Sequence, residues 1–159
     1  MKRFGSAASL ALAVVAVLGL AGPVPAGEQV PFNGKLQGDV TRTFEPPVIL
    51  VDVEATGTAN HLGRFTLDVP HVVDPTTRMA SGSYQFTAAN GDTLYAEFTG
   101  QATPTATPGV LYIEETATIT GGTGQFAGAT GSFTAERWYD TAAGTTVGSF
   151  EGTISRPGS

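Results

Sequence analysis

The sequence predicts an all-β fold, a single eight-stranded antiparallel closed β-barrel that follows a short leader. Three observations support this prediction. Beyond residue 26, apolar and polar residues alternate with a period of two, which is typical of strands with one buried face. Threonine, glycine, valine and phenylalanine are abundant there, and helical periodicity is absent. Turns rich in glycine and proline separate the apolar runs at short intervals, so consecutive strands are expected to be antiparallel.

The leader, residues 1–26, has the pattern of a cleaved secretory signal peptide. Lys2 and Arg3 precede an apolar run from Ala7 to Ala21, and small residues up to Ala26 form a cleavage site. The apolar run is shorter than the roughly 20 residues that a membrane span requires. We therefore expect a secreted protein, periplasmic or extracellular, with no membrane association after cleavage and one mature domain at residues 27–159.

The mature domain is acidic and contains no cysteine. Lys2 and Arg3 belong to the leader, so their removal changes the net charge from −6 to −8. Such a charge repels phosphate backbones, and nucleic-acid binding is therefore not expected. A domain of this length buries roughly two-thirds of its unfolded surface, so it needs no disulfide for stability.

Turn residues mark the ends of eight expected strands. Glu45-Pro46-Pro47 ends the first strand, because proline cannot donate to a ladder. His61-Leu62-Gly63 and Ala142-Ala143-Gly144 end on the glycine of a tight loop, and Pro104–Pro108 separates two later strands. Asn90-Gly91 predicts a two-residue hairpin with positive φ at both positions. The strands are expected at Val30–Thr41, Ile49–Asn60, Arg64–Val73, Arg78–Ala88, Asp92–Ala102, Val110–Thr120, Ala129–Asp140 and Thr145–Ser155.

Eight strands in an antiparallel meander commonly close into a barrel, which removes exposed edges. The alternation assigns aromatic and aliphatic residues to the interior, together with glycines that let strands bend and large neighbours fit. A barrel of this size is either filled by its own side chains or holds one small ligand. A two-sheet β-sandwich is the structural alternative. The expected interior residues include Phe32, Leu36, Val53, Phe65, Leu67, Phe86, Leu94, Phe98, Phe133, Phe150 and Ile154, with glycines at 34, 38, 57, 82, 100, 148 and 152.

A glycine-rich segment, Ile119–Ala127, has the glycine spacing of a dinucleotide-binding turn. That interpretation requires an amphipathic helix and then a second parallel strand. Instead, Gly128–Phe133 follows with a β-like composition, and too few residues remain for a doubly wound sheet. No nucleotide cofactor is therefore expected.

The same region resembles the glycine-rich turn between two late strands of allene oxide cyclase-like and dirigent-like barrels, a group with uncharacterised bacterial secreted members. The resemblance covers about Leu111 to Trp138 and elsewhere concerns only strand number and spacing. It implies an eight-stranded barrel, often trimeric, whose plant members direct cyclisation or radical coupling of small apolar substrates. It implies no catalytic residue here, because the catalytic residues of those plant enzymes match no position of this sequence. Catalytic residues therefore stay unknown. It implies structural roles for the turn: unusual backbone angles at Gly121, Gly122 and Gly124, a barrel plug at Phe126, and Gly128 in the same loop.

Two charged residues interrupt the apolar face. Glu115 follows Leu111 and Ile113 on the inward parity of one strand, and Arg137 follows Phe133 and Ala135 on the next. A single buried charge is costly, so the two are expected to pair. They are candidate ligand-binding residues, a polar anchor for a carboxylate, carbonyl or hydroxyl in an apolar cavity. The alternative is an ion pair with a structural role only.

His71 and Tyr84 also lie on the inward parity and are further ligand-binding candidates. The alternatives are a rim histidine and a phenol that caps the core. Neither His71 nor His61 has a second histidine or a cysteine at ligand spacing, and no calcium-binding loop motif is present, so no metal is expected.

Three functions follow from these features. The first is a binding barrel for a small apolar molecule, and the second is a cyclase or isomerase with Glu115 as base and His71 or Tyr84 as acid. The third is a structural or interaction module with a filled interior. We favour the non-enzymatic interpretation. Trp138, on the outer face, is a candidate subunit contact in a homo-oligomer, and a trimer is implied by the family resemblance alone.

Overall fold

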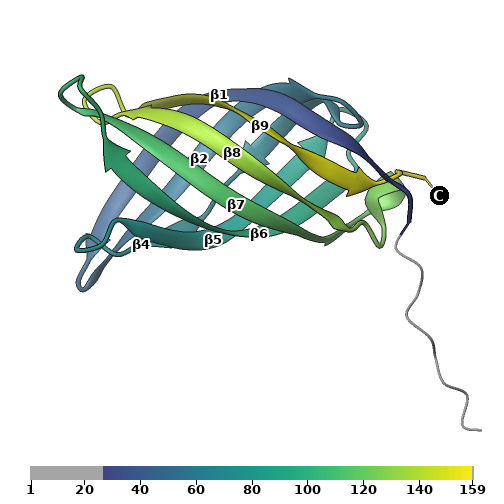
Figure 1. Cartoon of the computed structure of the whole chain (residues 1–159), viewed down its shortest axis with the longest axis horizontal. Helices are drawn as coiled ribbons and strands as arrows, with labels where there is room; N and C mark the ends of the chain where they lie inside the picture. Colours follow the sequence, from purple (N-terminus) through teal and green to yellow (C-terminus); the bar gives the residue numbers. More distant parts are fainter. Residues whose placement is uncertain (1–26, 159) are drawn as a thin grey trace, which may run out of the picture.

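The computed structural model describes residues 27–158, which form one antiparallel sheet of nine strands that closes into a barrel (Figure 1). The expected secretory leader, residues 1–26, lies outside the described residues. No helix within residues 27–158 is long and apolar enough to cross a membrane. The elements are β1 (Gln29–Glu45), β2 (Val48–Ala59), β3 (Gly63–Asp68), β4 (His71–Val73), β5 (Met79–Ala88), β6 (Thr93–Pro104), β7 (Val110–Gly122), the 3₁₀ turn η1 (Gly124–Phe126), β8 (Gly131–Asp140) and β9 (Thr145–Ser155).

The first strand closes the barrel. One edge of β1 pairs with β2, and its other edge pairs with β9, the last strand of the chain. The short strands β3 and β4 both lie between β2 and β5, so nine strands occupy eight positions. The expected eight-stranded antiparallel closed barrel is confirmed. A two-sheet sandwich is wrong, because it would leave edge strands that this pairing does not have.

The expected strand Arg64–Val73 is interrupted and does not form one continuous element. β3 ends at Asp68 and β4 begins at His71, yet both keep the same register against β2 and β5. Pro70 lies between them and has no N–H to donate to the ladder. Its carbonyl still accepts a hydrogen bond from Ser83 N at 3.2 Å. The proline therefore removes one ladder bond without moving the strand.

The expected two-residue hairpin at Asn90-Gly91 is wrong. Gly91 has a φ of 91°, but Asn90 is not among the residues with positive φ. Ala88 N donates to Asp92 O at 2.8 Å, and Gly91 N donates to Ala88 O at 2.9 Å, so the loop holds residues 89–91. This is a type I turn followed by a left-handed glycine, the usual geometry of a three-residue hairpin.

The inward face matches the alternation of the sequence and is rich in aromatic rings. Phe86 lies at the centre of these rings, within 5.2–6.1 Å of five other ring centroids. Inward glycines provide the space. A Cβ at Gly57 would lie 2.6 Å from Phe65 Cζ and 2.0 Å from Lys35 O. The clustered rings are Phe32, Phe65, Tyr84, Phe86, Phe98, Phe133 and Phe150.

The two ends of the barrel differ (Figure 1). At the closed end, where the C-terminus and η1 lie, Phe126 is fully buried, and Leu62 and Ala129 are buried beside the core. At the other end, which we call the open end, lie the turn at Pro46-Pro47 and the loop that includes Pro104–Pro108. Residues of the inward parity are only half-buried there: Val40, Ile49, Val73, Ala80, Ala102, Leu111 and Ile113.

Because a methyl group at residue 57 would overlap both a backbone carbonyl and a core ring, we expect Gly57→Ala to destabilise the protein by roughly 1–3 kcal/mol. Denaturant unfolding measures this change. Thr58→Ala, on the outward face of the same strand, is the control and should change the stability by no more than about 0.5 kcal/mol. Equal stability of the two variants would contradict this account of the interior.

Candidate functional site

The two charged residues that interrupt the apolar alternation form a buried ion pair inside the barrel. Glu115 on β7 is 1% exposed and Arg137 on the neighbouring β8 is 2% exposed. Arg137 Nη2 donates to Glu115 Oε1, and Arg137 Nε donates to Glu115 Oε2 at 3.4 Å. The guanidinium therefore faces both carboxylate oxygens, a geometry that lysine could not reproduce.

Two glycines make room for this pair. A Cβ at Gly100 would lie 2.7 Å from Glu115 Cγ, and a Cβ at Gly148 would lie 2.8 Å from Arg137 Cγ. Gly100 is directly opposite Glu115, and Gly148 is directly opposite Arg137, on the outer neighbours of the two charged strands. Each charged side chain thus lies across the glycine of the adjacent strand.

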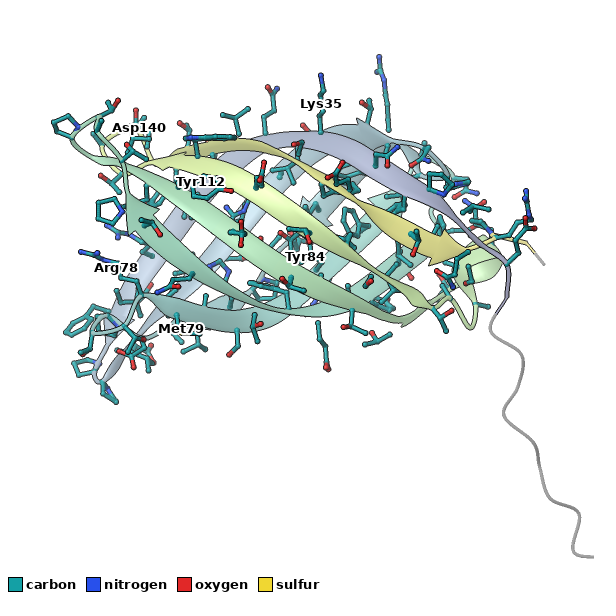
Figure 2. The ribbon with its side chains drawn as sticks, viewed as in Figure 1. Lys35, Arg78, Met79, Tyr84, Tyr112 and Asp140 are labelled. Carbon is teal, nitrogen blue, oxygen red and sulfur yellow. The ribbon has the colours of Figure 1, made fainter. Side chains whose placement is uncertain are left out.

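Two hydroxyl groups complete the hydrogen bonds of the pair. Tyr84 on β5 lies in the barrel interior (Figure 2), and its hydroxyl donates to Glu115 Oε2. Arg137 Nη1 donates to Thr146 Oγ1 at 3.2 Å, and Thr146 donates in turn to the carbonyl of Trp138 at 3.0 Å. Among the described residues, every buried side-chain nitrogen and oxygen has a partner. We call these four residues, Tyr84, Glu115, Arg137 and Thr146, the buried network.

Burial sets the protonation of the buried network. Desolvation raises the pKa of Tyr84 well above its usual value of 10, and the nearby Glu115 carboxylate raises it further. Desolvation alone would lower the pKa of Arg137, but Glu115 and Tyr84 together outweigh it, so that pKa is raised. Tyr84 therefore stays a protonated donor, and Arg137 keeps its charge.

His71 lies on β4, half-buried, with its ring edge-on to Phe98 at 5.6 Å between centroids. Its Nδ1 is 2.8 Å from the carbonyl of Val69, so Nδ1 carries the proton and Nε2 is the acceptor of the neutral ring. Burial lowers the pKa of His71, and the Glu115 carboxylate opposes this shift only in part. His71 is therefore a neutral histidine, and it lies directly opposite Val51 of the neighbouring strand β2.

Arg42 is a charged residue at the open end that the sequence patterns do not reveal. It lies on β1 opposite Val51, which is also opposite His71 on the other side. Its guanidinium carbon is 5.7 Å above the centroid of the buried Tyr139 ring. The strand predicted here ends at Thr41, whereas β1 continues to Glu45, and Arg42 therefore has an inward parity that its sequence position did not suggest.

The glycine-rich turn after β7 forms the closed end. Gly121, Gly124 and Gly128 have φ values of 144°, 57° and 70°, and Gly122 is not among the residues with positive φ. At Gly122 the constraint is space, because a Cβ would lie 2.2 Å from Thr93 O and 2.7 Å from Phe126 Cβ. Phe126 is fully buried within the core cluster. The turn lies at the opposite end from Arg42 and takes no part in the buried network.

The side chains of this site form hydrogen bonds and an ion pair. Both oxygens of Glu115 already accept hydrogen bonds, from Arg137 and Tyr84. Within residues 27–158, no group of three or more histidine, aspartate or glutamate side chains could hold a metal ion. The half-buried His71 and the exposed Arg42 are polar residues of the inward parity towards the open end.

Comparisons with known proteins agree with the barrel. No protein-family model and no curated protein sequence matches the chain. Among solved structures, the pterocarpan synthase dirigent protein GePTS1 is similar with a TM-score of 0.58 and 13% identity, over 82% of this chain and 91% of that chain. The pterocarpan synthase dirigent protein PsPTS1 is similar with a TM-score of 0.53 and 12% identity, over 83% of this chain and 97% of that chain. The dirigent-like barrel predicted from the glycine-rich turn is confirmed at the level of the fold.

Removal of one member of the ion pair should destabilise the barrel strongly. We expect Glu115→Ala to cost about 3–5 kcal/mol, because it leaves the Arg137 charge buried without a partner. The double variant Glu115→Leu with Arg137→Met removes both charges and should unfold close to the wild-type midpoint in a denaturant titration. A double variant as unstable as the single one would show that the pair itself stabilises the fold.

Protonation of His71 should weaken the fold. Because its pKa is lower in the folded than in the unfolded protein, the unfolded chain binds more protons once the pH falls below about 6.5. The contribution of His71 is complete above that pH and declines as the pH decreases towards the folded-state pKa. We expect the wild-type protein to lose stability over this interval, and a His71→Gln variant to show a shallower slope. Thermal unfolding at a series of pH values measures both, and parallel slopes would contradict the assignment.

Proposed function

We propose that this dirigent-like barrel binds a small, mainly apolar molecule at its open end. The observation that supports this most is the arrangement of half-buried inward residues, among them Ala102 and Ile113, above a charge-compensated buried network. Apolar walls with a few fixed polar groups are the usual composition of small-molecule sites. The buried network forms the floor of the proposed site.

The groups that a ligand would reach first are His71 and Arg42, because Glu115 and Arg137 are almost fully enclosed. A neutral Nε2 on His71 accepts a hydrogen bond, and the guanidinium of Arg42 donates several. A ligand with an apolar body and one carboxylate, carbonyl or hydroxyl group would match these partners. Glu115, Arg137 and Tyr84 would then anchor it from below through charge and through their fixed geometry.

The closed half limits how deep a ligand can enter. Five of the seven clustered rings and the plug at Phe126 fill the barrel towards the closed end, whereas Tyr84 and Phe98 lie beside the buried network and His71. We therefore assign the ligand to the part of the barrel near the open end. The same filled half is the observation that favours the second candidate function, a structural or interaction module. A cyclase or isomerase with Glu115 as base is less well supported, because Arg137 and Tyr84 occupy its oxygens.

The proposed site of action is outside the cytoplasm, in the periplasm or the extracellular space. This proposal rests on the signal-like pattern of residues 1–26 in the sequence. The two similar proteins are called pterocarpan synthase dirigent proteins. We infer only that such a barrel can accommodate small molecules, and we carry no substrate over to this chain.

Native mass spectrometry of protein purified gently from its secretory source tests the binding function. We expect a co-purifying small molecule on the wild-type protein, and its loss in Ala102→Phe, which fills the open end. Gln101→Phe is the matched control, because residue 101 is the exposed neighbour on the outward face of β6, and it should keep the adduct. An unmodified mass for the wild-type protein would instead favour the structural or interaction module.

A further inference from the structure

The outer face of the barrel has a groove of about 660 Å³ that reaches the rim of the open end at Val110, Asp140 and Thr145. It crosses β2, β1, β9 and β8, which lie side by side because β1 pairs with both β2 and β9. We call it the outer groove. Its outward-facing lining residues include Asp39, Glu54, Trp138 and Val147, and it also touches Thr146 of the buried network.

Large apolar side chains lie exposed in this groove. Trp138 is 45% exposed and Val147 is 57% exposed, and the two residues are directly opposite each other on β8 and β9. Tyr112, opposite Trp138 on β7, packs against the indole with 5.4 Å between ring centroids. An exposed tryptophan in a hollow of the surface, supported by a neighbouring tyrosine ring, is typical of a contact site for a partner.

The sheet also places like charges directly opposite each other around these rings. Asp39 faces Glu54, and Glu54 faces Asp68 on its other side. On β7 and β8, Glu114 faces Glu136, and both accept hydrogen bonds from the hydroxyl of Tyr112. Like charges in direct cross-strand pairs destabilise a sheet.

No arginine or lysine of residues 27–158 forms a salt bridge with the carboxylates of this surface. The salt bridges within residues 27–158 join Glu115 to Arg137 and Glu28 to Arg156, and neither involves the outer groove. The carboxylates that line or border the groove therefore lack an arginine or lysine partner in that part of the chain. A positively charged ligand would turn the unfavourable like-charge pairs into favourable contacts.

We infer that the outer groove is a docking site for an extended, arginine- or lysine-bearing segment of a partner protein. A guanidinium or ammonium group stacks on the faces of tryptophan and tyrosine and at the same time pairs with carboxylates. Trp138 and the acidic residues Asp39 and Glu54 offer both partners within one hollow. The charge and the exposed rings together select a cationic occupant.

A second copy of this chain fits the groove less well. The cations Lys35 and Arg64 lie in a neighbouring hollow of about 920 Å³ on the same outer face, which shares Gln37, Thr56 and Val147 with the outer groove. A two-fold contact through this face would therefore set one concave surface against another. A narrow extended segment fills a hollow better than the convex wall of a second barrel does.

The fluorescence of Trp138 provides a direct test, because it is the single tryptophan of the sequence. The purified protein is titrated with a blocked pentapeptide of alternating arginine and glycine. We expect a saturable change in emission that added salt weakens. The matched peptide with citrulline in place of arginine is uncharged and should cause no change.

Variants separate this site from a general attraction to an acidic protein. Glu54→Gln should weaken peptide binding about threefold and should also raise the thermal midpoint, because it removes two like-charge contacts. Glu97→Gln is the control: this exposed carboxylate on β6 lies opposite Ser83 and Thr118, outside the groove. It should change neither the affinity nor the midpoint.

Three results would overturn the proposal. Equal weakening by Glu54→Gln and Glu97→Gln would indicate attraction to net charge alone. A response of Trp138 to maltohexaose and not to the arginine peptide would indicate a saccharide groove. Reversible dimerisation in sedimentation experiments that Glu54→Gln abolishes would identify a second copy as the occupant. Ligand binding at the open end is followed separately, by native mass spectrometry of the Ala102→Phe variant, so either proposal can fail without the other.

Discussion

A closed barrel of eight strand positions encloses a cross-section of nearly fixed width, and its side chains have to share that space. In this protein bulky rings and glycines alternate across neighbouring strands, as at Phe65 and Gly57. The same complementarity places Glu115 across from Gly100 and Arg137 across from Gly148. Where rings dominate, the interior is solid, and where smaller residues such as Ala80 and Ala102 replace them, the barrel is open.

The buried network marks the boundary between these two halves. An ion pair in this position is maintained only because its remaining hydrogen-bonding groups are also satisfied, by Tyr84 and Thr146. Both oxygens of the carboxylate are consequently occupied by donors of the barrel itself. For this reason the proposed function assigns ligand recognition to the half-buried His71 and the exposed Arg42, and gives the buried network a supporting role beneath them.

The sequence predicted the inward face well, because a period of two depends only on local geometry. Glu115 and Arg137 were found by the same rule. Arg42 was missed, since its strand continues beyond the predicted end, and Thr146 was missed because threonine is common on either face of a strand. The outer groove was not predictable, because Asp39 and Trp138 become neighbours only when β1 closes on β9, and alternation contains no information on closure.

The inner and outer surfaces of β8 are linked by a short chain of hydrogen bonds. Arg137 faces inward and donates to Thr146, which donates to the backbone carbonyl of Trp138, whose ring faces outward. The charged pair inside the barrel therefore fixes the backbone that carries the exposed indole, and a rigid platform loses little conformational entropy when a partner binds. The charges of Glu115 and Arg137 within the barrel neutralise each other, whereas the carboxylates around Trp138 on the outer face lie opposite other carboxylates. The stability that the interior provides allows the outer face to retain its unfavourable like-charge pairs.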